Sequence, residues 1–325
     1  MPTLDDVAAR AKVSKATASR ALSRPDLVAP ATTQRVRAAA MELGFVPNRA
    51  ARELARGRSG ILALVVPTLD NSFFTPIIGG AQTRAQEADL QLTVTVHPLE
   101  APAELAGFER LATQVDGVII VAPRGADDVV RQAGALKPAV LVDREIAGMT
   151  SVVADTATAF AALVRGLAES GHKYLVYIGG PDLSWQNSQR TMAVRDAAAA
   201  AGVQLEVISP YRATFASGTA LVDAVAASRA TAAIPYAADL GLGLLFGLHA
   251  RGLASLGRAS ARGEHAAIEV VGVPDAPGVD VDGEQLGARA MDYLIATLGG
   301  RTPEPPQLRL GVPVRWPRAS RPPQV

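Results

Sequence analysis

The sequence of 325 residues contains no cysteine. Disulfide bonds, thiolate metal sites and cysteine nucleophiles are therefore excluded, which is compatible with a reducing compartment. Lysine is scarce, since only four of the 32 basic residues are lysines, and we attribute the bias toward arginine and alanine to genome composition. No apolar run reaches about 18 residues, and the N-terminus lacks a basic-then-apolar signal pattern. We therefore expect a soluble cytoplasmic protein.

The sequence also lacks a recognisable catalytic or cofactor motif. The histidines are scattered without metal-ligand spacing, at His97, His172, His249 and His265. The glycines from Gly241 to Gly247 have the wrong spacing for a dinucleotide loop and fall inside a predicted helix, where small residues serve close packing. No Gly-x-Ser-x-Gly nucleophile motif is present. We expect no enzyme, no cofactor and no metal ion; the alternative is an α/β enzyme tethered to DNA.

Charge is divided unevenly along the chain, although the net charge is only +1. Residues 1–60 hold 11 basic and 5 acidic side chains, a net of +6, whereas residues 61–325 have a net of −5. A basic head on an acidic body concentrates positive potential where phosphates would bind. A solvated charged surface is the alternative explanation of the charge taken alone.

The basic head contains the pattern of two short helices joined by a tight turn. Leu4, Val7, Ala8 and Ala11 form one apolar stripe, and Thr3 can cap this helix together with Asp6. Ser14 can cap the second helix, on which the apolar side (Ala18, Ala21, Leu22) lies opposite the exposed side (Ala16, Arg20). Two helices joined in this way predict a helix-turn-helix, whose second helix enters the major groove of DNA.

A third helix and a possible hinge complete the head. Val36, Ala39, Ala40 and Leu43 repeat the apolar stripe, and Gly44 ends the helix. The segment 47–57 predicts a helix of about two turns, which is too short to be stable alone and needs DNA or a second subunit as partner. Leu54, flanked by Arg49 and Arg52, has the chemistry of a wedge for a minor-groove base step. The alternative is an ordinary linker helix with an incidental leucine.

Residues 3–57 resemble the lac-repressor/gal-repressor family of bacterial transcription regulators. The resemblance rests on "TLDDVAARAKVSKATASRAL", "ELGFVPNRAARELA" and the glycine that follows, without gaps. It implies a homodimer that binds a pseudo-palindromic double-stranded DNA operator through hinge helices that fold on DNA. The DNA-contacting positions it implies, with Arg52 from the wedge argument, are Ser14, Lys15, Ala16, Thr17, Ser19, Arg20, Asn48, Arg49, Arg52 and Leu54.

The base-reading positions differ in the base contacts that their side chains can make. Lys15, Ala16 and Arg20 occupy the base-reading places that the resemblance implies. Ala16 departs from family members with an amide side chain there, and it offers only an apolar contact, for example to a thymine methyl group. Arg20 is the best candidate for a bidentate contact to guanine.

From Gly60 onward, apolar runs alternate with alanine-rich helical stretches. The predicted strands begin at Ile61, Leu92, Gly117, Ala139, Tyr174, Thr231 and Ile268, and predicted helices include 76–88, 156–170, 187–201 and 239–251. Continuous apolar strands separated by helices predict parallel sheets covered on both faces. The span is long for one sheet, so we expect two βα subdomains with a ligand at the carboxyl ends of the strands.

Polar and aromatic residues at those strand ends form the candidate effector site. A combination of an arginine, carboxylates and aromatic rings suits a polar, hydroxyl-rich small molecule. Loop solvation or helix capping better explains Asp70 and Asp239 when each is taken alone. The candidate residues are Phe73, Phe74, Asp143, Trp185, Arg190, Tyr236, Asp239 and Asp275.

The body is also similar to the effector domain of the same family, which is related to periplasmic sugar-binding proteins. The matching stretches are "DNSFF", "DGVIIVAP", "VLVDRE", "ESGHKYLVYIGGP" and "VVGVPD". The resemblance implies a pocket containing Phe73, Phe74, Asp143, Trp185, Arg190 and Asp275. It departs at Ala238, where the family often has asparagine, and at Pro274, where it has an acidic residue. The loop after Asp275 is shortened, and an extra stretch, "SLGRASARGEH", precedes Ile268.

The sequence therefore predicts an all-α helix-turn-helix head followed by an α/β body of the periplasmic-binding-protein type. The expected boundaries are 1–46 for the head, 47–59 for the hinge and 60–325 for the body, which serves effector binding and dimerisation. Its subdomains would comprise 60–154 with 284–304 and 155–283 with 305–316, followed by a disordered tail at 317–325. We expect a dimeric repressor modulated by a sugar-like effector; the alternative is a regulator whose altered pocket senses no sugar.

Overall fold

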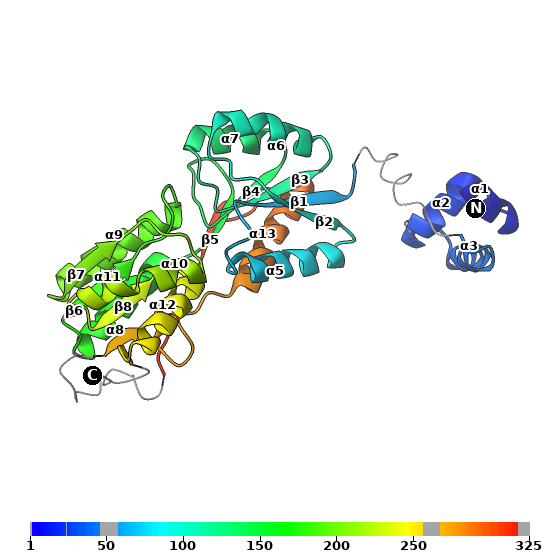
Figure 1. Ribbon diagram of the computed structural model, residues 1–325. Helices are drawn as coiled ribbons and strands as arrows, with labels where there is room; N and C mark the ends of the chain where they lie inside the picture. The colour runs from blue at the N-terminus through cyan, green and yellow to red at the C-terminus, as the bar shows by residue number, and fades with distance from the viewer. Residues whose placement is uncertain (1, 24, 46–57, 256–266, 318–325) are drawn as a thin grey trace. The chain divides into compact units, whose positions relative to one another are not determined.

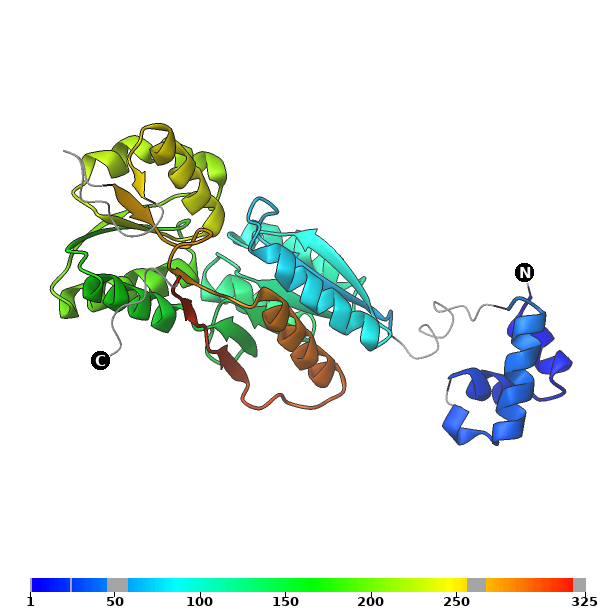
Figure 2. The same ribbon diagram turned by 90° about the horizontal axis from the view of Figure 1, so that it is seen from below.

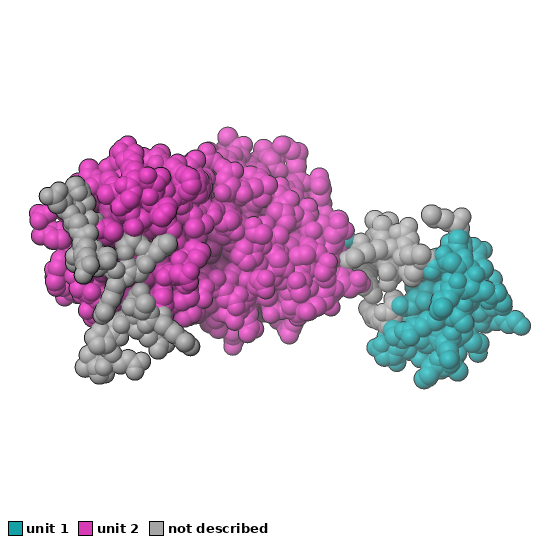
Figure 3. All heavy atoms as spheres, turned by 60° about the horizontal axis from the view of Figure 1, so that its bottom comes forward, with its two compact units in different colours: residues 1–59 teal, residues 60–325 magenta. Residues whose placement is uncertain are grey.

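The computed structural model describes residues 2–23, 25–45, 58–255 and 267–317. The chain divides into two compact units, Met1–Ser59 and Gly60–Val325, which we describe separately (Figure 3). The predicted hinge positions Asn48, Arg49, Arg52 and Leu54 lie outside the described residues, as do the extra stretch after Ser255 and the end of the chain.

The first unit is a small bundle of helices around one apolar core. Its elements are α1 (Leu4–Arg10), α2 (Lys15–Ser23), the 3-10 turn η1 (Pro25–Leu27) and α3 (Pro30–Glu42). The core is built mainly from alanine and valine on all three helices: Val7, Ala8, Ala11, Ala18, Ala21, Val36, Ala39 and Ala40. Small side chains allow the helices to approach closely, so the predicted apolar stripes meet at a single core.

The helix ends in this unit follow local sequence signals. Thr3 caps α1 because its hydroxyl accepts a hydrogen bond from the Asp6 backbone, while the Asp6 carboxylate accepts one from the Thr3 backbone. Gly44 has a φ of +62° just after α3, a conformation that costs glycine little. Arg10 of α1 forms an ion pair with Glu42 of α3 at 2.6 Å.

The second unit begins with a six-stranded parallel sheet in the order β12-β5-β4-β3-β1-β2. Its strands are β1 (Ile61–Val66), β2 (Gln91–Val96), β3 (Gly117–Val121), β4 (Ala139–Val142), β5 (Ser151–Ala154) and β12 (Gln307–Leu310). The helical elements of this subdomain are α5 (Phe74–Glu87), η2 (Pro102–Glu104), α6 (Leu105–Ala112), α7 (Asp127–Ala135) and α13 (Gly283–Leu298).

Both faces of this sheet are covered (Figure 1). Leu62, Leu64 and Val66 of β1 pack toward α5 and α13, whereas Ala63 and Val65 pack toward α6 and α7. Alternate residues of a strand point to opposite faces, so a continuously apolar strand fits a sheet buried on both sides. Helices α5 and α13 lie side by side although about 200 residues separate them in sequence (Figure 2).

A second parallel sheet, in the order β7-β6-β8-β10-β9, forms the other subdomain. Its strands are β6 (Tyr174–Ile178), β7 (Gln204–Ile208), β8 (Ala232–Pro235), β9 (Ala254–Ser255) and β10 (Ile268–Val270). Its helices are α8 (Thr156–Glu169), α9 (Trp185–Ala200), α10 (Phe215–Ala220), α11 (Val222–Ala227) and α12 (Ala238–Ala250). Helices α8 and α9 cover one face, and α11 and α12 cover the other. The predicted fold class, two parallel βα subdomains, is thus confirmed.

One predicted subdomain boundary differs from the structure. Residues 305–316 were assigned to the second subdomain, but β12 pairs in parallel with β5 at the edge of the first sheet. Only the following strand, β13 (Val314–Arg315), leaves that sheet, and it pairs antiparallel with β11 (Gly278–Val279). The reason is that two short strands lie on either side of Gly311, and each pairs with a different subdomain. No helix among the described residues is long and apolar enough to cross a membrane.

Candidate DNA-binding face and ligand cavity

Helix α2 presents a polar face on one side and packs into the core on the other. Lys15, Ala16 and Arg20 are exposed, whereas Ala18 and Ala21 are fully buried. Because α2 turns about 100° per residue, one side is fixed by the core and the opposite side is left for a partner. Thr17 and Ser19, also predicted to contact DNA, are half-buried at the edges of this face.

The first turn of α2 is held by two hydroxyl side chains. The Ser14 hydroxyl accepts a hydrogen bond from the Thr17 backbone at 3.1 Å and lies 2.9 Å from the Thr17 hydroxyl. This is the capping geometry that the sequence predicts. Lys15 directs its ammonium group to Asp5 of α1, at 2.7 Å, so the exposed face is not uniformly basic.

The second unit contains a cavity of about 340 Å³ at the carboxyl ends of its strands. Both subdomains contribute to its lining, as expected for a ligand site in a two-sheet α/β protein. Five of the predicted effector residues line it: Phe73, Phe74, Asp143, Arg190 and Tyr236.

A chain of buried polar side chains crosses one wall of this cavity. The Gln186 amide donates to Asp143 Oδ1 at 3.0 Å, and the Thr156 hydroxyl donates to Gln186 Oε1 at 3.0 Å. Arg190 Nε in turn donates to the Thr156 hydroxyl at 2.9 Å. Asp143 follows a strand of the first sheet, whereas Gln186 and Arg190 belong to α9 of the second subdomain. These hydrogen-bonded side chains therefore join the two subdomains directly.

Arg190 is fixed in place by aromatic rings as well as by hydrogen bonds. Its guanidinium carbon lies 5.1 Å from the Phe160 ring centroid and 4.7 Å from that of Tyr236, and Nη1 donates to the Tyr236 carbonyl at 2.9 Å. A guanidinium held between two rings loses little freedom when it binds a ligand. The bonds described use Nε and Nη1 of Arg190 and Oδ1 of Asp143, which leaves Nη2 and Oδ2 for a ligand.

The Asp143 carboxylate has an unusual environment. Only 2% of the residue is exposed, and this burial raises the pKa of its carboxyl group. The positive charge of Arg190 and hydrogen bonds from Gln186 and the Ala154 backbone act in the opposite direction, but they have smaller effects. The backbone of Asp143 has a φ of +55°, which aspartate tolerates better than most residues do.

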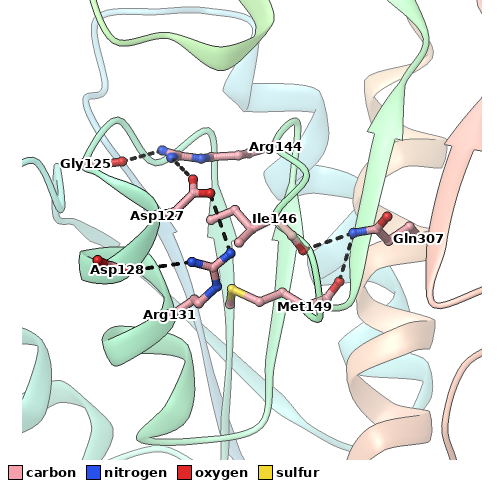
Figure 4. A network of polar contacts seen from close by, with 8 residues as sticks. All are labelled: Gly125, Asp127, Asp128, Arg131, Arg144, Ile146, Met149 and Gln307. Atoms are coloured by element: carbon pink, nitrogen blue, oxygen red, sulfur yellow. Dashed lines mark hydrogen bonds and ion pairs between the residues drawn. The ribbon is translucent and has the colours of Figure 1, made fainter.

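The neighbouring Arg144 anchors the loop that carries Asp143. Its guanidinium donates to the carbonyl oxygens of Pro123 and Gly125 and to the Asp127 carboxylate, each at 2.7 Å. Figure 4 shows Arg144 reaching toward Gly125 and Asp127, with Arg131 on the other side of Asp127. Arg144 thus binds the segment 123–127, whereas the preceding Asp143 lines the cavity.

Three predicted residues do not line the cavity. Trp185 is the first residue of α9 and is half-buried, and Asp239 lies in the first turn of α12. Asp275 is exposed and follows Pro274 in the short turn after β10, with a φ of +60°. The turn is too short to bring Asp275 back over the strand ends, because β11 begins at Gly278.

Sequence reasoning missed several cavity or network residues. Gln186 follows the predicted Trp185 by one position, and Thr156 and Phe160 lie on α8, which we considered only as a covering helix. Arg315 and Asp280 also line the cavity, from the segments that connect the subdomains. A helix-face analysis of α9 would have found Gln186, since it lies four residues before Arg190 on the same side.

Comparisons with known proteins define the class. Residues 3–48 match the family model of "bacterial regulatory proteins, lacI family", and residues 59–261 match that of "periplasmic binding proteins and sugar binding domain of LacI family". The chain belongs to the lacI family of bacterial regulatory proteins, as the sequence resemblance predicts.

Individual relatives are similar to different extents. The maltose regulon regulatory protein MalI of Escherichia coli is 34% identical over 58% of this chain and 56% of its own length. The repressor CytR of the same organism is 33% identical over 55% of this chain and 54% of its own length, so the chain matches about half the length of these relatives. The regulator CelR of Thermobifida fusca is 29% identical over 95% of both chains.

Solved structures agree with this classification. A CelR–cellobiose complex has a TM-score of 0.66 at 26% identity, covering 98% of this chain and all of that one. A Lac repressor dimer bound to operator and the anti-inducer ONPF has a TM-score of 0.81 at 22% identity, covering 98% and 99%. The latter likeness concerns the fold alone.

Proposed function

We propose that the protein is a sequence-specific DNA-binding transcription regulator, a repressor that binds a palindromic operator as a homodimer. The observation that carries the proposal is the exposed polar face of α2 on a small, basic, capped helical head. Lys15 and Arg20 supply donors for guanine, Ala16 offers an apolar contact, and Ser14, Thr17 and Ser19 offer hydroxyl groups for phosphates or groove edges. The hinge positions Asn48, Arg49, Arg52 and Leu54 would add backbone and minor-groove contacts.

Exposed apolar surface supports the homodimer. Val94 and Val96 lie on β2, an edge strand of the first sheet, and are 40% and 47% exposed. In the second subdomain, Phe246 of α12 is 64% exposed and its ring lies 5.8 Å from that of Phe215. Edge strands and aromatic patches of this kind are costly in a monomer, and a second copy of the chain would cover them.

We further propose that a small polar effector, sugar-like in its hydroxyl groups, binds the cavity and changes operator affinity. Asp143 and Arg190 would bind ligand polar groups, while Phe73, Phe74 and Tyr236 would pack on its apolar faces. Because the lining comes from both subdomains, a ligand would change their preferred orientation and thereby couple the two sites. Trp185, Asp239 and Asp275 would take part only if the first turns of α9 and α12 and the turn after β10 moved toward the cavity.

We also infer that the protein acts by binding rather than by turnover, and in the cytoplasm, where bacterial DNA lies. The relatives named above are regulators. An α/β enzyme tethered to DNA is the alternative; conversion of a metabolite by the full-length protein would support it.

Arg20 offers the most direct test of the DNA-binding face. Arg20→Ala should reduce affinity for the selected operator by roughly 1–3 kcal/mol and relax the preference at one base pair in each half-site. The matched control is Arg37→Ala on α3, where an exposed arginine of equal charge is lost away from α2. Fluorescence anisotropy on a set of single-base operator variants measures both effects. If Arg37→Ala relaxes base preference and Arg20→Ala does not, the assigned face is wrong.

A second candidate function is a regulator that senses no small molecule, and three observations favour it. Hydrogen bonds among Asp143, Gln186, Thr156 and Arg190 already satisfy some of the polar groups that a ligand would use, although Nη2 and Oδ2 are left. The exposed ion pair Arg212–Asp70 also joins the subdomains, at a smaller pocket beside the cavity. Ala238 and Pro274 remove polar groups that the family often has. A ligand-induced rise in melting temperature of the full-length protein, screened over sugars and nucleosides, would reject this candidate.

A further inference from the structure

An acidic side chain lies beside the exposed face of α2, in a head whose net charge is positive. Asp5 of α1 accepts a hydrogen bond from the Lys15 ammonium group at 2.7 Å. The two side chains are 63% and 62% exposed. Lys15 is the first residue of α2, so the ion pair lies at the end of the helix that is expected to enter the major groove.

Asp5 is not needed to form the end of α1. That role belongs to Thr3 and Asp6, whose side chains and backbone groups make both bonds of the capping box. An exposed ion pair contributes little to stability, because water and salt screen both charges. A carboxylate near DNA phosphates also weakens binding through repulsion. As an acidic residue in the first turn of α1, Asp5 also interacts favourably with the helix dipole, but that role requires no ion pair with Lys15. Non-specific DNA affinity would be higher without its negative charge.

The hydrogen-bonding groups of the Asp5–Lys15 ion pair complement those of a G·C base pair. In the major groove, guanine presents the acceptors N7 and O6, and the paired cytosine presents the N4 amino donor beside them. An ammonium group can only donate hydrogen bonds, and a carboxylate can only accept them. Side by side, the Lys15 ammonium and the Asp5 carboxylate thus offer a donor to guanine and an acceptor to cytosine.

We propose that Asp5 and Lys15 together read one G·C base pair in each half of the operator, with Asp5 as a specificity-determining residue. This inference rests on the proposed function, since it requires α2 to enter the major groove. An A·T pair would be rejected because thymine presents the O4 acceptor where cytosine presents an amino group, so the Asp5 carboxylate would face an oxygen. The Asp5 carboxylate thus lowers the affinity of the protein for DNA of any sequence, but it increases the discrimination between G·C and A·T at one position.

Operator selection from random DNA with full-length variants tests the proposal. The wild type should prefer G·C over A·T by about tenfold at one position of each half-site. Asp5→Ala and Asp5→Asn should accept A·T there within about threefold, since Lys15 can still donate to the N7 that both purines share, and only its contact to guanine O6 still favours G·C. Lys15→Ala should lose the preference for guanine at the same position. Asp26→Ala, which removes an exposed carboxylate of the same unit away from Lys15, should keep the wild-type preference.

The possible outcomes separate this inference from the proposed function. If the wild type selects a palindrome and Asp5→Ala selects the same one with equal discrimination, the inference is wrong and the regulator stands. If Asp5→Ala and Asp26→Ala both strengthen binding to all sequences equally, Asp5 acts by charge alone, which also overturns the inference. If the wild type selects no palindrome, the proposed function itself fails. Circular dichroism of Asp5→Asn, which keeps the side-chain size, checks that α1 remains folded.

Discussion

At the scale of single residues, the cavity contains a carboxyl group, that of Asp143, whose ionisation costs free energy because it is buried. Burial raises the pKa of the Asp143 carboxyl group above its usual value, and its neighbours offset only part of this effect. Between the usual and the raised pKa, the folded protein retains a proton that the unfolded chain has lost. Ionisation of Asp143 therefore lowers stability as pH rises through that window, and the cost is complete above the raised pKa.

Asp143→Asn should accordingly raise the melting temperature at neutral pH, and the gain should disappear as pH falls below about 4. The asparagine oxygen can still accept the bonds from Gln186 and the Ala154 backbone. Calorimetry from below pH 4 up to pH 8 at fixed protein concentration measures the difference. Asp182→Asn, at an exposed aspartate outside the cavity, is the control and should show no such trend. A gain that is equal at every pH would contradict the account.

Residue-level prediction worked where one simple rule applied. The rule that ligands sit at strand carboxyl ends found Phe73, Phe74, Asp143, Arg190 and Tyr236, all of which line the cavity. It included Trp185, Asp239 and Asp275 because it cannot tell which way a residue beyond a strand end points, whether that residue lies in a turn or at the start of a helix. Thr156 was missed because its role depends on how α8 packs against α9, which local sequence does not encode, whereas Gln186 could have been found from its place on the same side of α9 as Arg190. That any of these residues binds an effector stays a prediction.

At the scale of elements, close contact between α5 and α13 holds the first subdomain together. A Cβ atom added at Gly80 of α5 would lie 2.0 Å from the Glu284 carbonyl oxygen, and one added at Gly287 of α13 would lie 1.9 Å from that of Ile77. Each helix therefore has a glycine where the backbone of the other passes. Backbone atoms cannot move aside as a flexible side chain can, so these positions require glycine.

Gly80→Ala should destabilise the protein by about 1–3 kcal/mol or more, because the helices must separate. The adjacent Gly79 provides a matched control, since it lies on the same helix and a Cβ atom there would meet nothing within 4 Å. Gly79→Ala should be neutral or stabilising by up to about 1 kcal/mol, as alanine favours helix. Urea unfolding of both variants measures the difference. Equal effects of the two substitutions would mean that α5 and α13 do not meet as described.

Elements with strong periodicity were the easiest to predict. The buried strands β1, β3 and β6 and the long helices α8 and α9 appear where continuous apolar runs and amphipathic stretches predict them. Strand β7 (Gln204–Ile208) was missed because it is a partly exposed edge strand without an apolar run. Strand β12 was placed in the wrong subdomain because its pairing with β5 joins segments about 150 residues apart. Such pairings depend on the chain path and not on local pattern.

At the scale of the whole molecule, the proposed dimer should depend on the exposed aromatic side chains of the second subdomain. Phe246→Glu should shift the protein toward monomer in analytical ultracentrifugation, because a charge would be buried at the interface. Operator affinity should fall at least about tenfold, since two half-sites are no longer bound together. Leu136→Glu, at a 39% exposed leucine at the end of α7, is the control and should remain dimeric. A dimer unchanged by Phe246→Glu would place the interface elsewhere.

The central claim, a DNA-binding regulator with a ligand cavity in its body, is tested most directly by one measurement. Operator sequences are selected from random DNA with the full-length protein, and the affinity of the selected operator is then titrated with sugars and nucleosides. The account predicts a palindrome whose affinity changes with one of these ligands. A palindrome that is indifferent to every ligand would favour the regulator that senses none, and the absence of any palindrome would contradict the account itself.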